Sequence, residues 1–151
     1  MMLAKKKIVI LGAGGVVPSI IYALKKMNAN QIYLSNRTKD KAQILKNLFE
    51  GLEVINWGTL PDFDMIINAT SLGLKENDKF GIDFTKTGRN KLYYDVIYEP
   101  YKTEFSDAAK IEGNTYENGL NMFLFQAQRA FYIWHNIDPI INEDLINFLK
   151  S

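Results

Sequence analysis

Apolar residues follow two kinds of pattern along this chain. Short runs rich in β-branched and aromatic residues are typical of buried strands, whereas apolar residues three or four positions apart are typical of helices. The first pattern predicts strands at residues 7–11, 31–36, 52–57, 63–70, 91–98 and 114–118. The second predicts helices at residues 16–27, 38–49, 102–112, 119–136 and 139–150. Because strands and helices alternate, we expect one α/β domain over residues 1–151, with a doubly wound, mainly parallel sheet and helices on both faces.

Residues that suit helix ends support these boundaries. Pro18 lies in the first turn of a predicted helix, where its missing N–H costs nothing. Thr38 is a suitable N-cap for the second helix, and Asp138 with Pro139 suits the N-cap and first turn of the last one. In the long helix before it, an apolar stripe is expected to face the core, formed by Leu120, Leu124, Ala127, Phe131 and Trp134.

A glycine-rich turn joins the first predicted strand to the first predicted helix. In such a turn, glycines let the backbone approach a phosphate, and the helix N-terminus attracts negative charge. Val17 stands where the dinucleotide fingerprint has Gly or Ala, a position concerned with helix–strand packing. The pattern therefore predicts a Rossmann-type nucleotide site, with a purely structural turn as the alternative. The predicted phosphate contacts are Gly12, Ala13, Gly14, Gly15 and Val16.

The end of the second predicted strand indicates which nucleotide is bound. NAD-binding members of this fold class usually place a carboxylate there, and a carboxylate would repel a 2′-phosphate. This chain instead has Asn36, Arg37 and Thr38, with Lys41 one helical turn further on. A guanidinium can pair with phosphate in a planar geometry, and a lysine adds a point charge. We therefore expect NADP(H) as the cofactor; the alternative is a solvated basic turn.

Composition narrows the remaining functional classes. The net charge of +1 gives no electrostatic reason to expect nucleic acid or an anionic membrane as a partner. The chain has no cysteine and one histidine, so an imidazole- or thiolate-rich metal site is not expected. That histidine, His135, is expected to lie at a helix end rather than act as a catalyst. No apolar run approaches the ~18 residues of a membrane span, and we expect a cytoplasmic protein.

Five segments together resemble the C-terminal NADP-binding domain of the shikimate dehydrogenase family. In order they read GAGG, NRT, NATSLG, DVIYEP and GLNMFLFQA, and the resemblance runs from about Lys7 to the end of the chain. GAGG and NRT occur singly in other reductases, whereas the set of five is highly specific. The resemblance implies further cofactor contacts at Asn68, Ala69, Thr70, Ser71, Val96, Gly119 and Met122. It also implies substrate contacts at Tyr98 and Gln126.

The same resemblance implies a second domain that precedes this one. In the family that domain supplies the lysine and aspartate which act on the substrate, so no catalytic residue is assigned within this chain. The complete enzyme would reversibly reduce 3-dehydroshikimate to shikimate in aromatic amino-acid biosynthesis. We expect the helices within residues 119–150 to pack on the substrate domain and, without it, to favour self-association or a partner chain. Two alternatives stay open: a non-catalytic NADP sensor or docking module, and the cofactor half of a quinate-type dehydrogenase.

Overall fold

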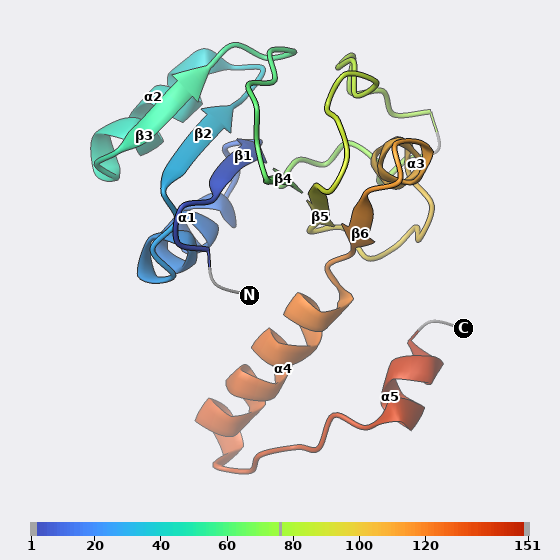
Figure 1. The fold of residues 1–151 in the computed structure, drawn as a ribbon. Helices are drawn as coiled ribbons and strands as arrows, with labels where there is room; N and C mark the ends of the chain where they lie inside the picture. Colours follow the sequence, from blue (N-terminus) through green and yellow to red (C-terminus); the bar gives the residue numbers. More distant parts are fainter. Residues whose placement is uncertain (1–2, 76, 150–151) are drawn as a thin grey trace. The chain divides into compact units, whose positions relative to one another are not determined.

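The computed structural model describes residues 3–75 and 77–149, which fall into two compact units along the chain. Met1–Asn118 form the first unit and Gly119–Ser151 the second. The first unit contains a six-stranded sheet in the order β3-β2-β1-β4-β5-β6, and every pairing in it is parallel (Figure 1). Its strands are β1 (Lys7–Leu11), β2 (Gln31–Ser35), β3 (Leu52–Ile55), β4 (Met65–Asn68), β5 (Leu92–Asp95) and β6 (Thr115–Glu117). Its helices are α1 (Val17–Lys26), α2 (Lys39–Leu48) and α3 (Glu104–Ile111).

Both faces of the sheet are covered, and β1 shows how. Alternate side chains of a strand point to opposite faces, so Ile8 and Ile10 pack with apolar residues of α1 and α2. Val9 and Leu11 instead join a second core, which includes Phe105 of α3. This second core is rich in aromatic rings, with Tyr93 and Phe105 centroids 5.0 Å apart. The doubly wound, parallel α/β fold predicted from the sequence is confirmed.

Several strands end sooner than the apolar pattern predicts. β4 was expected to reach residue 70 but ends at Asn68, because the Thr70 N–H turns to the Asn68 side chain instead of a neighbouring strand. The third strand was expected to reach residue 57 but ends at Ile55. Trp57 lies beyond it, half-buried, and its indole N–H donates to the Phe80 carbonyl at 3.0 Å. Apolar side chains just outside a strand thus contribute to the core without pairing in the sheet.

The second unit contains α4 (Leu120–His135) and α5 (Glu143–Phe148). The prediction that Asp138 and Pro139 begin the last helix is wrong. The Pro139 carbonyl accepts a hydrogen bond from Gln128 Nε2 at 2.8 Å, and the helix begins after Asn142, whose Oδ1 accepts from the Leu145 N–H. The expected core stripe holds only at its first two positions, Leu120 and Leu124, which are buried. Its other three members are exposed, among them Trp134 at 76%.

Across residues 3–75 and 77–149, none of the helices has the length and apolar character needed to cross a membrane.

Candidate functional site

Three neighbouring strands of the sheet end level with one another. Leu11, Asn68 and Asp95 are partners in the registers of β1 with β4 and of β4 with β5. The strand order also reverses direction between β1 and β4, since β2 and β3 continue on one side and β5 and β6 on the other. In open α/β sheets, ligands bind at such a reversal, outside the carboxyl ends of the strands. The loops that follow β1, β4 and β5 therefore form the candidate site.

Gly12 joins the first of these loops to the second. Its φ of +109° is one that a side chain rarely adopts, and a Cβ there would lie 2.6 Å from the Ala69 carbonyl oxygen. The Gly12 N–H also donates to the Ser35 carbonyl at the end of β2, at 2.7 Å. Only glycine fits this position, and its close approach holds the β1 and β4 loops together.

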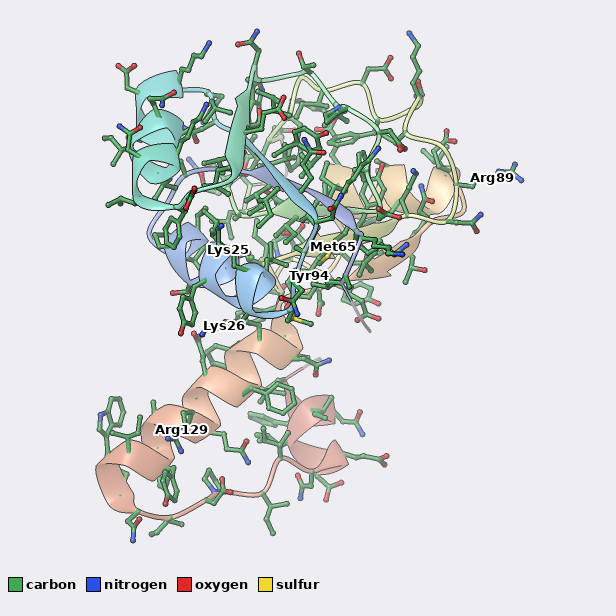
Figure 2. All side chains as sticks on the ribbon, turned by 60° about the vertical axis from the view of Figure 1, so that its left-hand side comes forward. Lys25, Lys26, Met65, Arg89, Tyr94 and Arg129 are labelled. Carbon is green, nitrogen blue, oxygen red and sulfur yellow. The ribbon has the colours of Figure 1, made fainter. Side chains whose placement is uncertain are left out.

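Gly14 and Gly15 have the opposite surroundings. Both are exposed, and a Cβ at either position would meet no atom of the described chain within 4 Å. They lead into α1, whose N-cap residue Val16 makes no side-chain capping hydrogen bond and whose first turn has no acidic residue. Lys25 and Lys26 occupy the last turn, at the far end of the helix (Figure 2). The open space and the positive end of the helix dipole together fit a pyrophosphate.

The turn after β2 is exposed and basic. Arg37, Thr38 and Lys41 all face solvent, and Asn36 is half-buried with its Nδ2 donating to the Thr38 carbonyl at 2.7 Å. Thr38 takes the predicted N-cap position of α2, although its side chain makes no capping hydrogen bond. The Asn36 side chain thus shapes the turn, and the guanidinium and ammonium groups stand on its surface. This arrangement fits a phosphate beyond the pyrophosphate, as in NADP(H).

The loop after β4 is held by the side chain of its first residue. Asn68 is fully buried, and its Nδ2 donates to Asp95 Oδ1 at 2.9 Å and to the Leu72 carbonyl at 3.1 Å. Its Oδ1 accepts from the Thr70 N–H at 3.1 Å and the Thr70 hydroxyl at 2.7 Å. An amide side chain has two donor hydrogens and two acceptor lone pairs, so that of Asn68 is saturated. The structure gives Asn68 the task of shaping the loop, in which Ser71 is the exposed polar side chain.

Asp95 is a site residue that the sequence reasoning did not single out. Its carboxylate is fully buried at the end of β5, and Oδ1 also accepts from the Ile97 N–H at 3.0 Å. Burial raises the pKa of Asp95 to about 6, while the hydrogen bonds from Ile97 and Asn68 act in the opposite direction. The signal in the sequence was an aspartate that directly ends an apolar strand (LYYD), a position where open α/β sheets bind ligands.

The other predicted residue positions fall into two groups. Val96 and Tyr98 follow β5 in the first unit: the Val96 N–H donates to the Asn68 carbonyl at 3.0 Å, and Tyr98 is 37% exposed. Gly119, Met122 and Gln126 belong to the second unit, at the N-cap and along α4. Their spacing places them on one face of that helix, where Met122 is half-buried and Gln126 exposed. Their roles stay predictions.

A cavity of about 1040 Å³ lies further along the segments that follow β4 and β5, between residues 73–75, residues 78–85, residues 99–103 and α3. The charged side chains that line it are mostly acidic. Two of these carboxylates bond to the backbone: Asp78 accepts from the Gly73 and Lys75 N–H groups, and Glu104 accepts from the Phe80 N–H. A carboxylate-rich lining disfavours phosphate. Its carboxylates are Asp78, Asp83, Glu99, Glu104, Asp107 and Glu112, against three lysines, Lys75, Lys79 and Lys102.

No group of three or more histidine, aspartate or glutamate side chains within residues 3–75 and 77–149 could hold a metal ion.

Comparison with known proteins connects this site to a family. Residues 1–74, which include the glycine turn and the first residues of the loop after β4, match the family model described as shikimate / quinate 5-dehydrogenase. A shikimate dehydrogenase (NADP(+)) of Pelagibacter ubique is 55% identical over 144 residues, which are 95% of this chain and 54% of that protein. This chain belongs to the shikimate dehydrogenase family. It spans about half the length of the curated relatives that it matches.

Solved structures of shikimate dehydrogenase-like proteins have the same fold. That of the Thermus thermophilus shikimate 5-dehydrogenase, in complex with NADP(H) and shikimate, superposes with a TM-score of 0.79 at 27% identity, over 90% of this chain and 51% of the other. A ligand-free 5-ketofructose reductase of Gluconobacter gives a TM-score of 0.82 at 31% identity, over 93% of this chain and 54% of the other. The fold is therefore shared by reductases named for different substrates.

Proposed function

We propose that this chain is the NADP(H)-binding part of a shikimate dehydrogenase-like oxidoreductase. The observation that supports this most strongly is the pairing of two features on neighbouring strands. An open glycine turn at an uncapped helix N-terminus follows β1, and an exposed Arg37 instead of a carboxylate follows β2. The first feature suits any dinucleotide, and the second selects the one with a 2′-phosphate.

Each part of the site has a distinct task in this proposal. Backbone N–H groups of residues 13–16 bind the pyrophosphate, for which Gly14 and Gly15 leave space, and Gly12, whose N–H is bonded to Ser35, allows the tight turn. Arg37 and Lys41 bind the 2′-phosphate, and Asn36 and Thr38 shape the turn that presents them. The loops at 68–71 and at Val96 border the nicotinamide end of the cofactor. Gly119 and Met122 are proposed to contact the nicotinamide as well, and Tyr98 and Gln126 the substrate.

For the complete protein we propose reversible reduction of 3-dehydroshikimate to shikimate. NADP(H), when bound, supplies or accepts the hydride. The support is the name of the relatives, shikimate dehydrogenase (NADP(+)), of which the first is 55% identical to this chain. Protonation of the developing alkoxide needs an acid near the ketone, and we assign none of the described residues to that role. A cytoplasmic location stays a prediction, which cell fractionation would check.

A second candidate is the same cofactor chemistry on another substrate. Two observations favour it: the family model covers quinate as well as shikimate dehydrogenases, and a 5-ketofructose reductase shares the fold at 31% identity. Activity of the complete protein on shikimate, quinate and 5-ketofructose, assayed side by side, separates these substrates.

We also propose that the second unit binds a further protein surface, either a substrate domain or another copy of this chain. Large apolar side chains are exposed on it, including Phe125 at 63%, Ile133 at 66% and Ile140 at 84%. Burial of such side chains is favourable by roughly 25 cal/mol per Å². Sedimentation velocity over a hundredfold range of concentration is expected to show association. A single monomeric species throughout would contradict self-association.

The first experiment is calorimetric titration of this chain with NADP⁺ and, separately, with NAD⁺. We expect NADP⁺ to bind at least about tenfold more tightly, because one charge-assisted hydrogen bond contributes roughly 1.5–3 kcal/mol. Arg37→Ala should remove most of this preference and leave the affinity for NAD⁺ unchanged. Lys46→Ala, an exposed lysine in the last turn of α2, is the matched control and should change neither affinity. Equal binding of the two nucleotides by the unaltered chain would overturn the NADP assignment.

A further inference from the structure

A single carboxylate oxygen ties together the two loops that follow β4 and β5. Asp95 Oδ1 accepts from the Asn68 side chain at 2.9 Å and from the Ile97 N–H at 3.0 Å. We infer that Asp95 is a positioning residue of the nucleotide site: by orienting the Asn68 amide, it fixes the loop that borders the nicotinamide. This inference rests on the proposed function and assigns a new residue to it.

The contact follows from the sheet itself. Asn68 and Asp95 end adjacent parallel strands and are partners in register, so their side chains leave the sheet on the same face. Both are fully buried, and therefore water does not compete for their hydrogen bonds. The geometry of the two loops thus depends on bonds within the protein.

The chemistry of the two groups decides which way the Asn68 amide faces. An ionised carboxylate only accepts hydrogen bonds, so the NH₂ group of Asn68 must face Asp95. The amide oxygen is then directed to Thr70, where it accepts from both the backbone N–H and the hydroxyl. The Thr70 hydroxyl in turn accepts from the Leu72 N–H at 3.0 Å. With the amide reversed, its NH₂ group would face the Thr70 N–H, and these bonds would be lost.

The same oxygen also fixes the start of the β5 loop. Its bond to the Ile97 N–H holds the turn that contains Val96 and leads to Tyr98. The Val96 N–H donates back to the Asn68 carbonyl at 3.0 Å, which joins the two loops a second time. Asp95 therefore supports residues proposed for the cofactor side and for the substrate side together.

Burial of the carboxylate opposes its ionisation and gives the arrangement a measurable signature. Desolvation raises the pKa of Asp95 to about 6. The charge of Asp95 in turn acts on Tyr116 of β6, whose pKa is raised well above its usual value by burial and then by Asp95. Tyr116 therefore stays neutral between pH 4 and 8, and changes near Asp95 in this range report on the carboxylate.

The test compares two replacements of similar shape by calorimetry with NADP⁺ at pH 7. Asp95→Asn keeps an acceptor, because the Ile97 N–H directs the new amide oxygen into the place of Oδ1, and its Kd should stay within about threefold of the unaltered chain. Asp95→Leu has no acceptor, and its Kd should rise at least about tenfold. Ile66 is buried in β4, two residues before Asn68, and Ile66→Ala is the control for lost packing. Its Kd should stay within about twofold of the unaltered chain.

A second readout concerns the contact itself. In nitrogen–proton NMR spectra of the unaltered chain, the Asn68 side-chain NH₂ signals should shift with pH, with a midpoint near 6, and this shift should vanish in Asp95→Asn. If Asp95→Leu fails to fold, this titration decides: its presence supports the inference, and its absence overturns it.

The outcomes separate this inference from the function on which it rests. If Asp95→Leu binds NADP⁺ as tightly as the unaltered chain, or Asp95→Asn as weakly as Asp95→Leu, the positioning role is wrong and the NADP site stands. If the unaltered chain binds neither NADP⁺ nor NAD⁺, the proposed function fails, and the positioning role fails with it even where the NMR titration is seen.

Discussion

The two ends of the candidate nucleotide site are built in opposite ways. The turn after β2 presents Arg37 and Lys41 to solvent, with one side-chain hydrogen bond from Asn36 to shape it. The loops after β4 and β5 are organised around Asn68 and Asp95, both fully buried and bonded to each other. In the proposed site, the first region selects the nucleotide by charge on exposed side chains, whereas the shape of the second is held by hydrogen bonds within the protein.

This difference has a physical consequence for how each region responds to change. Exposed charges act through solvent, so their contribution to binding is modest and falls with salt. A buried polar network loses the full desolvation free energy when one partner is removed, so its changes affect folding and binding together. Selectivity between nucleotides and stability of the site are therefore expected to be separable by mutation.

The largest effect is expected where the buried region meets the glycine turn. Gly12→Ala places a Cβ 2.6 Å from the Ala69 carbonyl oxygen at a φ of +109°, which should lower the free energy of unfolding by about 2–4 kcal/mol. Gly14→Ala is the matched control: its Cβ meets open space, so stability should be retained while NADP⁺ binds about tenfold more weakly, because the methyl group occupies the space for phosphate. Urea unfolding and calorimetry measure the two quantities. Equal stability of both variants would contradict the close approach at Gly12.

An intermediate effect is expected from pH at the buried carboxylate. The folded-state pKa of Asp95, about 6, lies above the unfolded value near 3.8, so the unfolded chain ionises first as pH rises. The contribution of Asp95 to the free energy of unfolding is thus most favourable below pH 4. It falls by about 3 kcal/mol between pH 4 and 7, because the pKa shift is about two pH units. The asparagine of Asp95→Asn does not titrate. As pH rises from 4 to 7, the free energy of unfolding of this variant should therefore rise by this amount relative to that of the unaltered chain.

Other carboxyl groups stabilise the fold in the opposite pH range, so the effect of Asp95 appears only in the difference between Asp95→Asn and the unaltered chain. The pKa of Asp64 is lowered by hydrogen bonds from the Lys6 side chain and the Lys7 N–H, so its contribution is lost at low pH. Asp64 is present in both chains, and its effect cancels in the difference. Urea unfolding at pH 4, 5, 6 and 7 gives this difference directly. A constant difference would mean that the Asp95 carboxyl titrates normally.

Among these three predictions, the smallest effect is expected from Lys41, on the exposed turn. Lys41→Ala should weaken NADP⁺ binding about two- to threefold at low salt and leave the unfolding free energy unchanged, since a solvated lysine contributes about 0.5 kcal/mol. The loss should shrink further at 0.5 M salt, where the Debye length is short. Calorimetry at two salt concentrations is the measurement. A loss that does not depend on salt would place Lys41 in a buried contact.

Much of the framework was predictable because its signals are local. Strands β1 and β2, Pro18 in the first turn of α1 and the glycine turn all follow from a few adjacent residues. The start of the last helix differs in this respect. Asp138 and Pro139 form a good local signal, yet the Pro139 carbonyl is bonded to Gln128 eleven residues earlier, and Asn142 caps the helix instead. A contact between distant residues outweighed a local preference.

The organisation of the candidate site was less predictable for the same reason. The expected cofactor contact at Asn68 stays a prediction, but its side-chain partners could not be predicted, because one of them is 27 residues away. Asp95 could be understood only once the register of β4 and β5 was known. The exposed residues at 37 and 41 needed no such knowledge, because a surface charge is recognisable from its position after a strand.

The two tryptophans lie in different units and in different environments, so intrinsic fluorescence can report on each unit. Trp57 is half-buried in the first unit with its indole bonded to the Phe80 carbonyl, and Trp134 is 76% exposed in the second. The fluorescence of an indole ring moves to longer wavelength with hydration, so the two tryptophans should have different emission maxima. Single replacements by phenylalanine would then leave one reporter in each unit, and melting of the sheet could be followed separately from rearrangement of the terminal helices without any added dye.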